Sequence, residues 1–206
     1  MKKVVILGAT GQTGKIVVAQ ALNAGYAVTA FVRGAEEFLP HKNLIVIKGD
    51  ARKADDLEFA MGGQDAVISV LGTHKVNDDL ITESTNALIK AAHANKVKRI
   101  IMMSSFLASG QLKQSLVSWV LAKLSAGLIG DKQTGEELLK SSDLDWTIVY
   151  ATRLGNGPAT GATSIVAKDE KVTTSNGIDR ADVADFLVAE VENTAHIRES
   201  LLITTR

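Results

Sequence analysis

The sequence predicts an α/β fold, a doubly wound parallel sheet with helices on both faces. Two observations support this prediction. Short runs rich in β-branched residues alternate with longer segments of helical period, which is the pattern of parallel strands joined by crossover helices. Several of these runs are apolar on both faces, as expected for strands that helices cover on each side. The 206 residues show no linker, repeat or low-complexity tract, so we expect a single domain over 1–206.

The individual elements follow from the same pattern. Glycines and a proline cluster between positions 155 and 161, which makes the last third less regular than the rest. Strands are expected at 4–7, 28–32, 44–47, 66–70, 99–103 and 146–149, with shorter ones at 163–166 and 201–204 at one end of the sheet. Helices are expected at 13–23, 54–61, 78–94, 113–126, 132–141 and 181–193. Ligands of such sheets bind at the carboxyl ends of the strands, so we expect the substrate pocket there, completed by segments 104–130 and 151–180.

Composition and charge exclude several classes of function. Lysine plus arginine and aspartate plus glutamate both number 23, so no excess positive field would hold nucleic acid or an anionic membrane. The absence of cysteine removes disulfides and thiolate sites, and it favours a cytoplasmic location. The four histidines lack metal-ligand spacing, so no metal site is expected. The most apolar stretch, 112–129, is interrupted by lysines and serines, so no membrane span is expected.

A glycine-rich loop directly follows the first strand and opens a helix. Its residues are Gly8, Ala9, Thr10, Gly11, Gln12, Thr13 and Gly14. Such a loop lets backbone approach a diphosphate closely and directs the amino terminus of the helix at its charge. We therefore expect these residues to bind a dinucleotide; the alternative is an ordinary strand-to-helix turn.

Two residues after the next strands bear on the choice of dinucleotide. Arg33 stands where NAD-preferring enzymes usually have an acid, and its guanidinium would attract the 2′-phosphate of NADP. NADP(H) is therefore preferred, with NAD(H) possible, although Glu36 and Glu37 dilute the positive field. Asp50 follows the third strand and is in the right region to accept a hydrogen bond from the adenine amino group. A solvated arginine and a turn or helix-capping acid are the alternatives.

The fourth and fifth strands end in small and polar residues that should face the same crevice. They are Leu71, Gly72 and Thr73 after the fourth strand, and Ser104 and Ser105 at the fifth. Small residues allow close approach of a cofactor's ribose, and a serine hydroxyl can hold a carboxamide or a substrate oxygen. The alternative is that the serines are turn residues.

The glycine spacing resembles that of the atypical short-chain dehydrogenases/reductases, in their regulator-like NAD(P)-binding branch. Further matching pieces are Gly25-Tyr26, Gly49-Asp50, Gly63-Gln64-Asp65-Ala66-Val67-Ile68, Leu71-Gly72-Thr73 and Thr160-Gly161-Ala162. Within this branch the chain is most similar to the NADPH-dependent flavin reductases of the biliverdin-IXβ reductase type. The matches run through most of the chain in the same order. The resemblance implies a Rossmann-type enzyme that binds NADPH under an open acceptor pocket.

The resemblance also implies roles for single residues. Ser105 takes the place of the active-site serine, and Ser104 that of a threonine. Short-chain dehydrogenases donate a proton through a Tyr-x-x-x-Lys pair, but neither Tyr26 nor Tyr150 has lysine four residues later. Lys132 could replace that lysine alone; a surface lysine at a helix start is the alternative.

The chain departs from these reductases at three points. Arg153 stands in place of an active-site histidine; it could clamp a flavin phosphate or a propionate but cannot titrate near neutrality. Glu37 replaces a second arginine near the 2′-phosphate, which weakens the NADP preference. Segment 111–130 differs from the reductases' proline-containing loop, and it is a core helix or else an apolar lid or dimer face.

The function expected from these observations is hydride transfer from NAD(P)H to a flavin, quinone-like or linear-tetrapyrrole acceptor. Flavin would be a substrate rather than a tightly bound cofactor, because it can accept hydride without a positioned tyrosine. One alternative is a redox sensor that binds the dinucleotide without turnover. Another is a nucleotide-sugar epimerase or dehydratase, for which the short carboxyl-terminal region leaves little room. We expect a monomer or weak homodimer.

Overall fold

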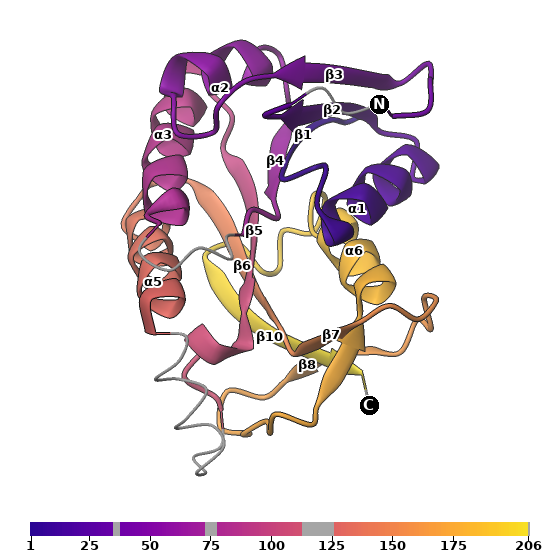
Figure 1. Ribbon diagram of the computed structural model, residues 1–206, viewed down its shortest axis with the longest axis vertical. Coiled ribbons are helices and arrows are strands. Elements are labelled where there is room, and N and C mark those ends of the chain that lie inside the picture. Colours follow the sequence, from indigo (N-terminus) through magenta and orange to yellow (C-terminus); the bar gives the residue numbers. More distant parts are fainter. Residues whose placement is uncertain (35–37, 73–77, 113–125, 206) are drawn as a thin grey trace.

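An eight-stranded sheet forms the centre of the molecule (Figure 1). The computed structural model of the chain describes residues 1–34, 38–72, 78–112 and 126–205. The strands are arranged in the order β3-β2-β1-β4-β5-β6-β10-β8, and neighbours are parallel except for β10 and β8. Their bounds are β1 Lys3–Leu7, β2 Ala27–Val32, β3 Leu44–Lys48, β4 Ala66–Ser69, β5 Arg99–Ser105, β6 Asp145–Ala151, β8 Thr163–Val166 and β10 Glu199–Thr205. The predicted doubly wound α/β sheet is confirmed.

Helices cover both faces of this sheet. In Figure 1, α1 and α6 lie on one face, and α2, α3 and α5 lie on the other. Their bounds are α1 Gln12–Asn23, α2 Ala54–Met61, α3 Leu80–Asn95, α5 Ala126–Lys140 and α6 Arg180–Ala189. Because side chains of a strand alternate between its faces, Val4 packs in the core beneath α1 and α6, whereas Val5 packs in the core beneath the other helices. Burial on both faces explains why the inner strands are continuously apolar.

The predicted strands are all present, each within two residues of its predicted ends. Two helices differ from the prediction. α5 begins at Ala126 rather than at 132, and α6 ends at Ala189 rather than at 193. α6 ends early because the guanidinium of Arg99 draws the carbonyls of Glu190 and Asn193 to itself, at 2.6 and 3.3 Å. The predicted helix at 113–126 lies outside the described residues, apart from the position where α5 begins.

Three short elements were not predicted. They are the 3-10 helix η1 Phe106–Ala108 and the strands β7 Arg153–Gly155 and β9 Gly177–Asp179, which pair with each other in a separate two-stranded sheet. Each has three residues, which is too few for a hydrophobic period to appear in the sequence.

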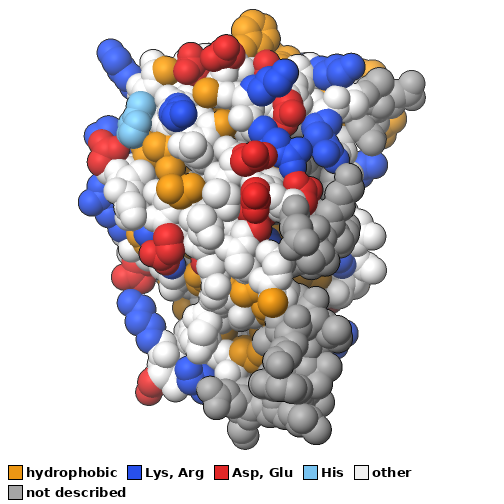
Figure 2. Space-filling model, turned by 60° about the vertical axis from the view of Figure 1, so that its left-hand side comes forward, with side chains coloured by type: hydrophobic (Ala, Val, Ile, Leu, Met, Phe, Trp, Pro, Cys, Tyr) orange, Lys and Arg blue, Asp and Glu red, His pale blue; other side chains and the backbone are white. Residues whose placement is uncertain are grey.

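No helix in the described part of the chain is both long enough and apolar enough to cross a bilayer. On the face that Figure 2 presents, lysine and arginine side chains are interspersed with aspartate and glutamate. Acidic and basic side chains are therefore intermixed on this face rather than gathered in separate areas.

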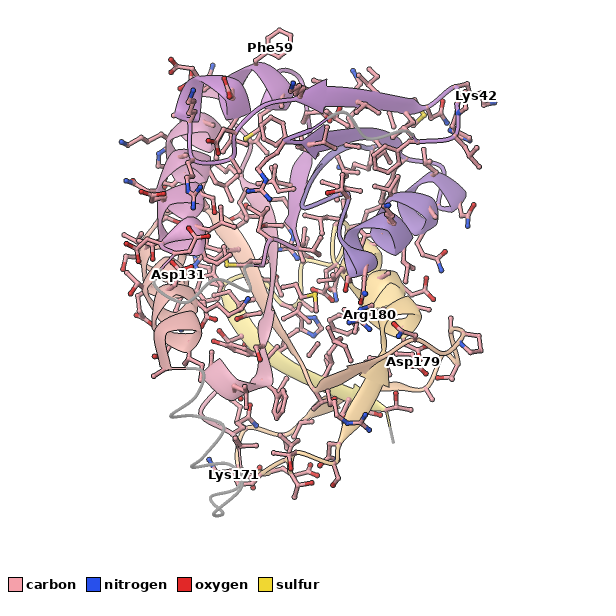
Figure 3. All side chains as sticks on the ribbon, viewed as in Figure 1. Lys42, Phe59, Asp131, Lys171, Asp179 and Arg180 are labelled. Carbon is pink, nitrogen blue, oxygen red and sulfur yellow. The ribbon has the colours of Figure 1, made fainter. Side chains whose placement is uncertain are left out.

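A buried carboxylate joins α5 to α3. Asp131 of α5 is 6% exposed and accepts hydrogen bonds from the backbone amides of Ile81 and Thr82, at 2.9 and 2.8 Å. These amides lie in the first turn of α3, where backbone donors lack partners within the helix. Asp79, at the usual capping position of α3, makes no side-chain cap, so Asp131 takes over this role from another helix. Figure 3 shows Asp131 where the two helices meet.

Replacing Asp131 by alanine is expected to lower the free energy of unfolding by about 1–3 kcal/mol, because two amides of a buried helix end lose their acceptor. Urea unfolding measures the change, and hydrogen exchange should show faster exchange at the amides of Ile81 and Thr82. Glu137→Ala is the matched control on the same helix; its carboxylate is 70% exposed, and its removal should change stability by less than about 0.5 kcal/mol. Equal effects of the two substitutions would contradict the assigned cap.

Candidate functional site

A cleft of about 220 Å³ lies at the carboxyl ends of β1, β2 and β4, where the strand order reverses. Crevices at this position of a doubly wound sheet are where ligands bind. Of the residues predicted to bind a dinucleotide, seven line this cleft: Gly8, Thr10, Gly11, Arg33, Asp50, Leu71 and Gly72. They come from four separate stretches of the chain, so the fold brings together what the sequence keeps apart. Thr73, predicted with them, lies outside the described residues.

The glycine loop closes tightly upon itself. Gly8 has a φ of +79°, which favours glycine, and a Cβ there would lie 2.9 Å from the carbonyl oxygen of Val70. A Cβ on Gly14 would overlap the carbonyl oxygen of Gly8. That same oxygen accepts a hydrogen bond from the amide of Gly11 at 3.0 Å. The loop therefore requires glycine at both ends, and this requirement is what the spacing in the sequence reflects.

The helix that follows the loop begins without a capping side chain. Gly11 is the N-cap of α1 and offers no side-chain acceptor, and neither acidic residue nor side-chain cap occurs in the first turn. Gln12 is exposed, whereas Thr13 and Gly14 are buried. Uncapped amides and the positive end of the helix dipole together suit a bound anion. The local geometry thus fits the diphosphate of a dinucleotide.

At the other end of the cleft, the ends of β2 and β3 supply a cation and an acid. Arg33 is exposed at the rim. Asp50 accepts a hydrogen bond from the amide of Arg52 at 3.0 Å through one carboxylate oxygen. Arg52 in turn forms ion pairs with Asp78 and with Glu83, the latter at 2.6 Å. Asp50 is therefore a turn residue that also lines the cleft, and its contact with adenine stays a prediction.

Apolar residues that the sequence analysis did not single out complete the cleft. They are Phe31, Val32, Ala51, Val70 and Leu80. Three of them are direct neighbours of predicted residues and Phe31 lies two positions before Arg33, so extending each motif by one or two positions would have found these four. Leu80 comes from the first turn of α3, which Asp131 holds in place, and no motif marks it.

Ser104 and Tyr150 donate hydrogen bonds to one buried carboxylate. The hydroxyl of Ser104 lies 2.5 Å from Oε1 of Glu136, and the hydroxyl of Tyr150 lies 2.5 Å from Oε2. Ser104 is 5% exposed and Tyr150 also 5%. Burial, followed by the hydrogen bond and charge of Glu136, raises the pKa of Tyr150 above the usual range of a phenol. Neither hydroxyl is open to a ligand, contrary to the expectation that Ser104 faces the crevice.

Ser105 and Lys132 occupy less buried positions. The hydroxyl oxygen of Ser105 accepts a hydrogen bond from the amide of Leu107 at 3.4 Å and so caps η1, which leaves its proton for another acceptor. Lys132 lies in the second turn of α5 and is half-buried, so the alternative of a surface lysine at a helix start is wrong. Burial lowers the pKa of Lys132, and the carboxylates of Glu136 and Asp131 oppose this effect.

Arg153 does not line the cleft. It is exposed on β7 and lines a second hollow, also of about 220 Å³, together with Gly155, Gly177, Ile178, Asp179 and Thr205. This placement separates Arg153 from the glycine loop, although the sequence analysis assigned both to one site. Among the described residues, no three histidine, aspartate or glutamate side chains are grouped so as to hold a metal ion.

Acidic residues at the start of α6 shape the loop beside the second hollow (Figure 3). Asp182 is 1% exposed and accepts hydrogen bonds from the hydroxyl and amide of Thr160 and from the amide of Gly161, each at 2.8 Å. Burial alone would raise the pKa of Asp182, but these three hydrogen bonds hold it below its usual value. Asp179 binds the amide of Gly157 in the same way, at 2.7 Å. The Thr160-Gly161 part of the sequence resemblance therefore has a structural role, which is to bind the carboxylate of Asp182.

Comparison with known sequences relates the chain to proteins of photosynthetic organisms. A family described as NAD(P)H-binding matches residues 8–194. An uncharacterized chloroplastic protein of Arabidopsis thaliana is 31% identical over 201 residues, covering 91% of this chain and 71% of that protein. Photosystem II assembly factor Ycf39 of Synechocystis is 26% identical over 204 residues, covering 92% of this chain and 58% of that protein. The chain thus spans little more than half the length of the Synechocystis relative.

Solved structures share the fold along nearly the whole chain. A short-chain dehydrogenase/reductase of Veillonella parvula in complex with NADP has a TM-score of 0.81 at 21% identity, covering 98% of this chain and 94% of that one. ChuY, an anaerobillin reductase of Escherichia coli O157:H7, has a TM-score of 0.79 at 20% identity, covering 98% and 96% of the two chains. At these identities the likeness shows a common fold.

Gly14→Ala is expected to lower the free energy of unfolding by about 2–3 kcal/mol, because the added methyl group would overlap the carbonyl of Gly8 and force the loop apart. Gly130→Ala, within α5, is the matched control. A Cβ there meets no neighbouring atom, and alanine should stabilise the helix by about 0.5–1 kcal/mol. Thermal and urea unfolding distinguish the two. A Gly14→Ala protein as stable as wild type would contradict the predicted overlap between the added methyl group and the carbonyl of Gly8.

Asp182→Asn is expected to lower stability at neutral pH by about 1–2 kcal/mol, since charge-assisted hydrogen bonds are lost. The folded-state pKa of Asp182 is depressed, so its carboxylate stabilises the fold above the unfolded value of 3.8, and this contribution disappears as the pH falls through the folded pKa. The difference between variant and wild type should therefore vanish between about pH 5 and pH 2 in urea titrations. The exposed Asp169→Asn serves as control, and a difference for Asp182→Asn that does not depend on pH would refute the assignment.

Proposed function

The chain belongs to the NAD(P)H-binding family, and from that premise we propose that it is an NADPH-dependent reductase. Its fold is that of the short-chain dehydrogenase class, as the resemblance in the sequence predicted. NADPH supplies a hydride, and we propose a flavin, a quinone-like compound or a linear tetrapyrrole as the small-molecule acceptor.

The cleft at the ends of β1, β2 and β4 supports this proposal most directly, because it combines the glycine loop with a cation at the end of β2. The amides of the loop and of the first turn of α1 would hold the diphosphate. Arg33 would bind the 2′-phosphate, in the position where an acid would select NAD. Asp50 would accept a hydrogen bond from adenine, and Leu71 and Gly72 would lie against the ribose.

The buried hydroxyls at the ends of β5 and β6 bear on the acceptor. Ser104 and Tyr150 both bind Glu136 and are closed off from solvent, so neither can donate a proton to a nascent alkoxide. An acceptor that takes hydride on a conjugated ring needs no such donor, since solvent supplies its proton. Ser105 retains a hydroxyl proton that could hold a substrate oxygen. Arg153 is left out of this site, because it lines the second hollow.

A sensor that binds the dinucleotide without consuming it is a second candidate. It is favoured by the likeness to a photosystem II assembly factor, together with the burial of Ser104 and Tyr150, whose hydroxyls are bound to Glu136 and closed off from a substrate. A sensor requires different affinities for the oxidised and reduced dinucleotide. The two candidates separate on turnover. A decline of the reduced-nicotinamide absorbance that exceeds the enzyme-free rate with any member of a flavin, quinone and tetrapyrrole panel supports the reductase, and no decline with every member supports the sensor.

Arg33→Ala is expected to weaken NADPH binding about tenfold or more, equivalent to about 1.4 kcal/mol, while NADH binding changes less than about threefold. The reason is that only NADPH carries the phosphate that the guanidinium would contact. Calorimetric titration of both dinucleotides measures this. Lys48→Ala, which removes an exposed cation outside the cleft, is the control and should affect neither affinity. Parallel losses for NADPH and NADH in Arg33→Ala would overturn the proposed preference.

A further inference from the structure

A tight turn between β3 and α2 places two residues in the wall of the cleft. Asp50 and Ala51 line the cleft, and Arg52 follows them in the turn. The amide of Asp50 donates a hydrogen bond to the carboxylate of Asp56 at 2.8 Å. The amide of Arg52 donates to the carboxylate of Asp50 at 3.0 Å, and the amide of Lys53 donates to the carbonyl of Asp50 at 2.9 Å. These hydrogen bonds close the turn, so the backbone of Arg52 is fixed relative to the two cleft residues.

The first turn of α3 contributes another residue to the same cleft. Leu80, the first residue of α3, is buried and lines the cleft. Two acidic residues bracket Leu80 in the sequence, Asp78 just before the helix and Glu83 in its first turn. α2 and α3 lie side by side (Figure 1). The start of α3 therefore carries a cleft residue together with two carboxylates that can connect it to the neighbouring turn.

The guanidinium of Arg52 pairs with both of these carboxylates. Its Nη2 pairs with Asp78, and its Nε lies 2.6 Å from a carboxylate oxygen of Glu83. The side chains of Arg52 and Asp78 are 32% and 22% exposed, so this ion pair is partly shielded from solvent. A planar guanidinium presents several donors in a fixed arrangement and can hold two acids at once. Arg52 thus joins the turn after β3 to the start of α3.

Arg52 is not one of the residues that line the cleft. It lines a separate hollow of about 280 Å³, together with residues of α2 and α3 that include Glu83 and Lys90. Its guanidinium is occupied by two carboxylates, whereas Arg33 is exposed at the rim of the cleft. The two arginines are therefore suited to different roles. Arg33 is placed to meet an anionic ligand, and Arg52 is placed to connect two parts of the wall.

We propose that Arg52 is a positioning residue for the adenine end of the dinucleotide. It holds Leu80 in place relative to Asp50 and Ala51 without touching the ligand. The inference rests on the proposed function, since that function assigns this end of the cleft to adenine. Without the ion pairs, the start of α3 is displaced from the turn in a fraction of the molecules. The apparent dissociation constant then rises by the inverse of the fraction that remains competent to bind.

The decisive variant is Arg52→Gln, which removes the charge but keeps a polar side chain at a half-buried position. The dissociation constants of NADPH, NADH and ADP, measured by calorimetry, should each rise by a similar factor of about three to ten. ADP is the probe for this end of the cleft, because it carries adenine and a diphosphate but neither the 2′-phosphate nor nicotinamide. Lys53→Gln removes an exposed cation at the next residue and is the matched control, which should leave all three constants unchanged.

The partners of Arg52 separate positioning from a general effect of charge. Asp78→Asn combined with Glu83→Gln breaks the same ion pairs, so it should also weaken binding of all three ligands. If Arg52 acted only through its positive field, removing two negative charges would instead favour these anionic ligands. Adding Arg52→Gln to the double variant should weaken binding no further, because the three side chains act as one unit.

Salt gives an independent readout, because it screens ion pairs that are partly exposed. Between about 0.05 and about 1 M potassium chloride, the ratio of the ADP dissociation constants of Arg52→Gln and wild type should shrink toward one.

Unchanged affinities in Arg52→Gln, even with a lower midpoint in urea unfolding, would mean a structural role only and overturn the inference while leaving the proposed function intact. A loss confined to NADPH would assign Arg52 to the 2′-phosphate and overturn it as well. Should Arg52→Gln fail to fold, the variant with Asp78→Asn and Glu83→Gln decides. Weaker binding there supports the inference, and unchanged or tighter binding overturns it. Wild-type protein that binds neither NADPH nor NADH overturns the proposed function and the inference together.

Discussion

The contact of Gly14 with the carbonyl of Gly8 is the constraint on which the arrangement of the cleft depends. With no side chain between them, α1 starts directly at the end of β1, and its amino terminus faces the crevice between β1 and β4. The same carbonyl binds the amide of Gly11, so the loop has a single way to close. The other residues that line the cleft, from Arg33 to Leu71, lie across from this turn.

A second set of constraints comes from α5, which places two carboxylates in the interior. Asp131 completes the start of α3, and Glu136 completes the ends of β5 and β6. Each carboxylate is a hydrogen-bond acceptor for donors on another element, the amides of α3 or the hydroxyls of β5 and β6. Because breaking a buried polar network leaves unpaired groups in a medium of low dielectric, α5 is fixed in register against the sheet as well as packed on it. α5 lies on the face of the sheet opposite α1, and through the first turn of α3 it is connected to the same cleft.

Much of the fold could be predicted because the chain repeats one pattern. Apolar runs such as 66–68 are buried on both faces and leave little choice of element, and the glycine loop marks its own position. The end of α6 could not be predicted, since Arg99, far away in the sequence, decides where that helix stops. The three-residue strands β7 and β9 exist only because they pair with each other.

For the candidate site, the residues of the cleft were predicted better than those at the strand ends. Arg33 and Asp50 belong to motifs whose position in the sequence fixes their position in space. The partner of Ser104 is different, because no motif connects Glu136 with a serine thirty-two residues earlier, and only the packing of α5 on β5 brings them together. Arg153 was assigned by alignment with a histidine in related reductases, but β7 carries it into another hollow.

The edge strand β3 has a consequence for the behaviour of the protein in concentrated solution. Ile45 and Val46 are 63% and 42% exposed there, on a strand whose outer backbone groups could pair with another chain. In an antiparallel encounter of two copies centred on Ile45, Lys42 of each copy would face Lys48 of the other. The two lysine pairs at the flanks would then repel each other, so these lysines oppose edge-to-edge pairing of two sheets.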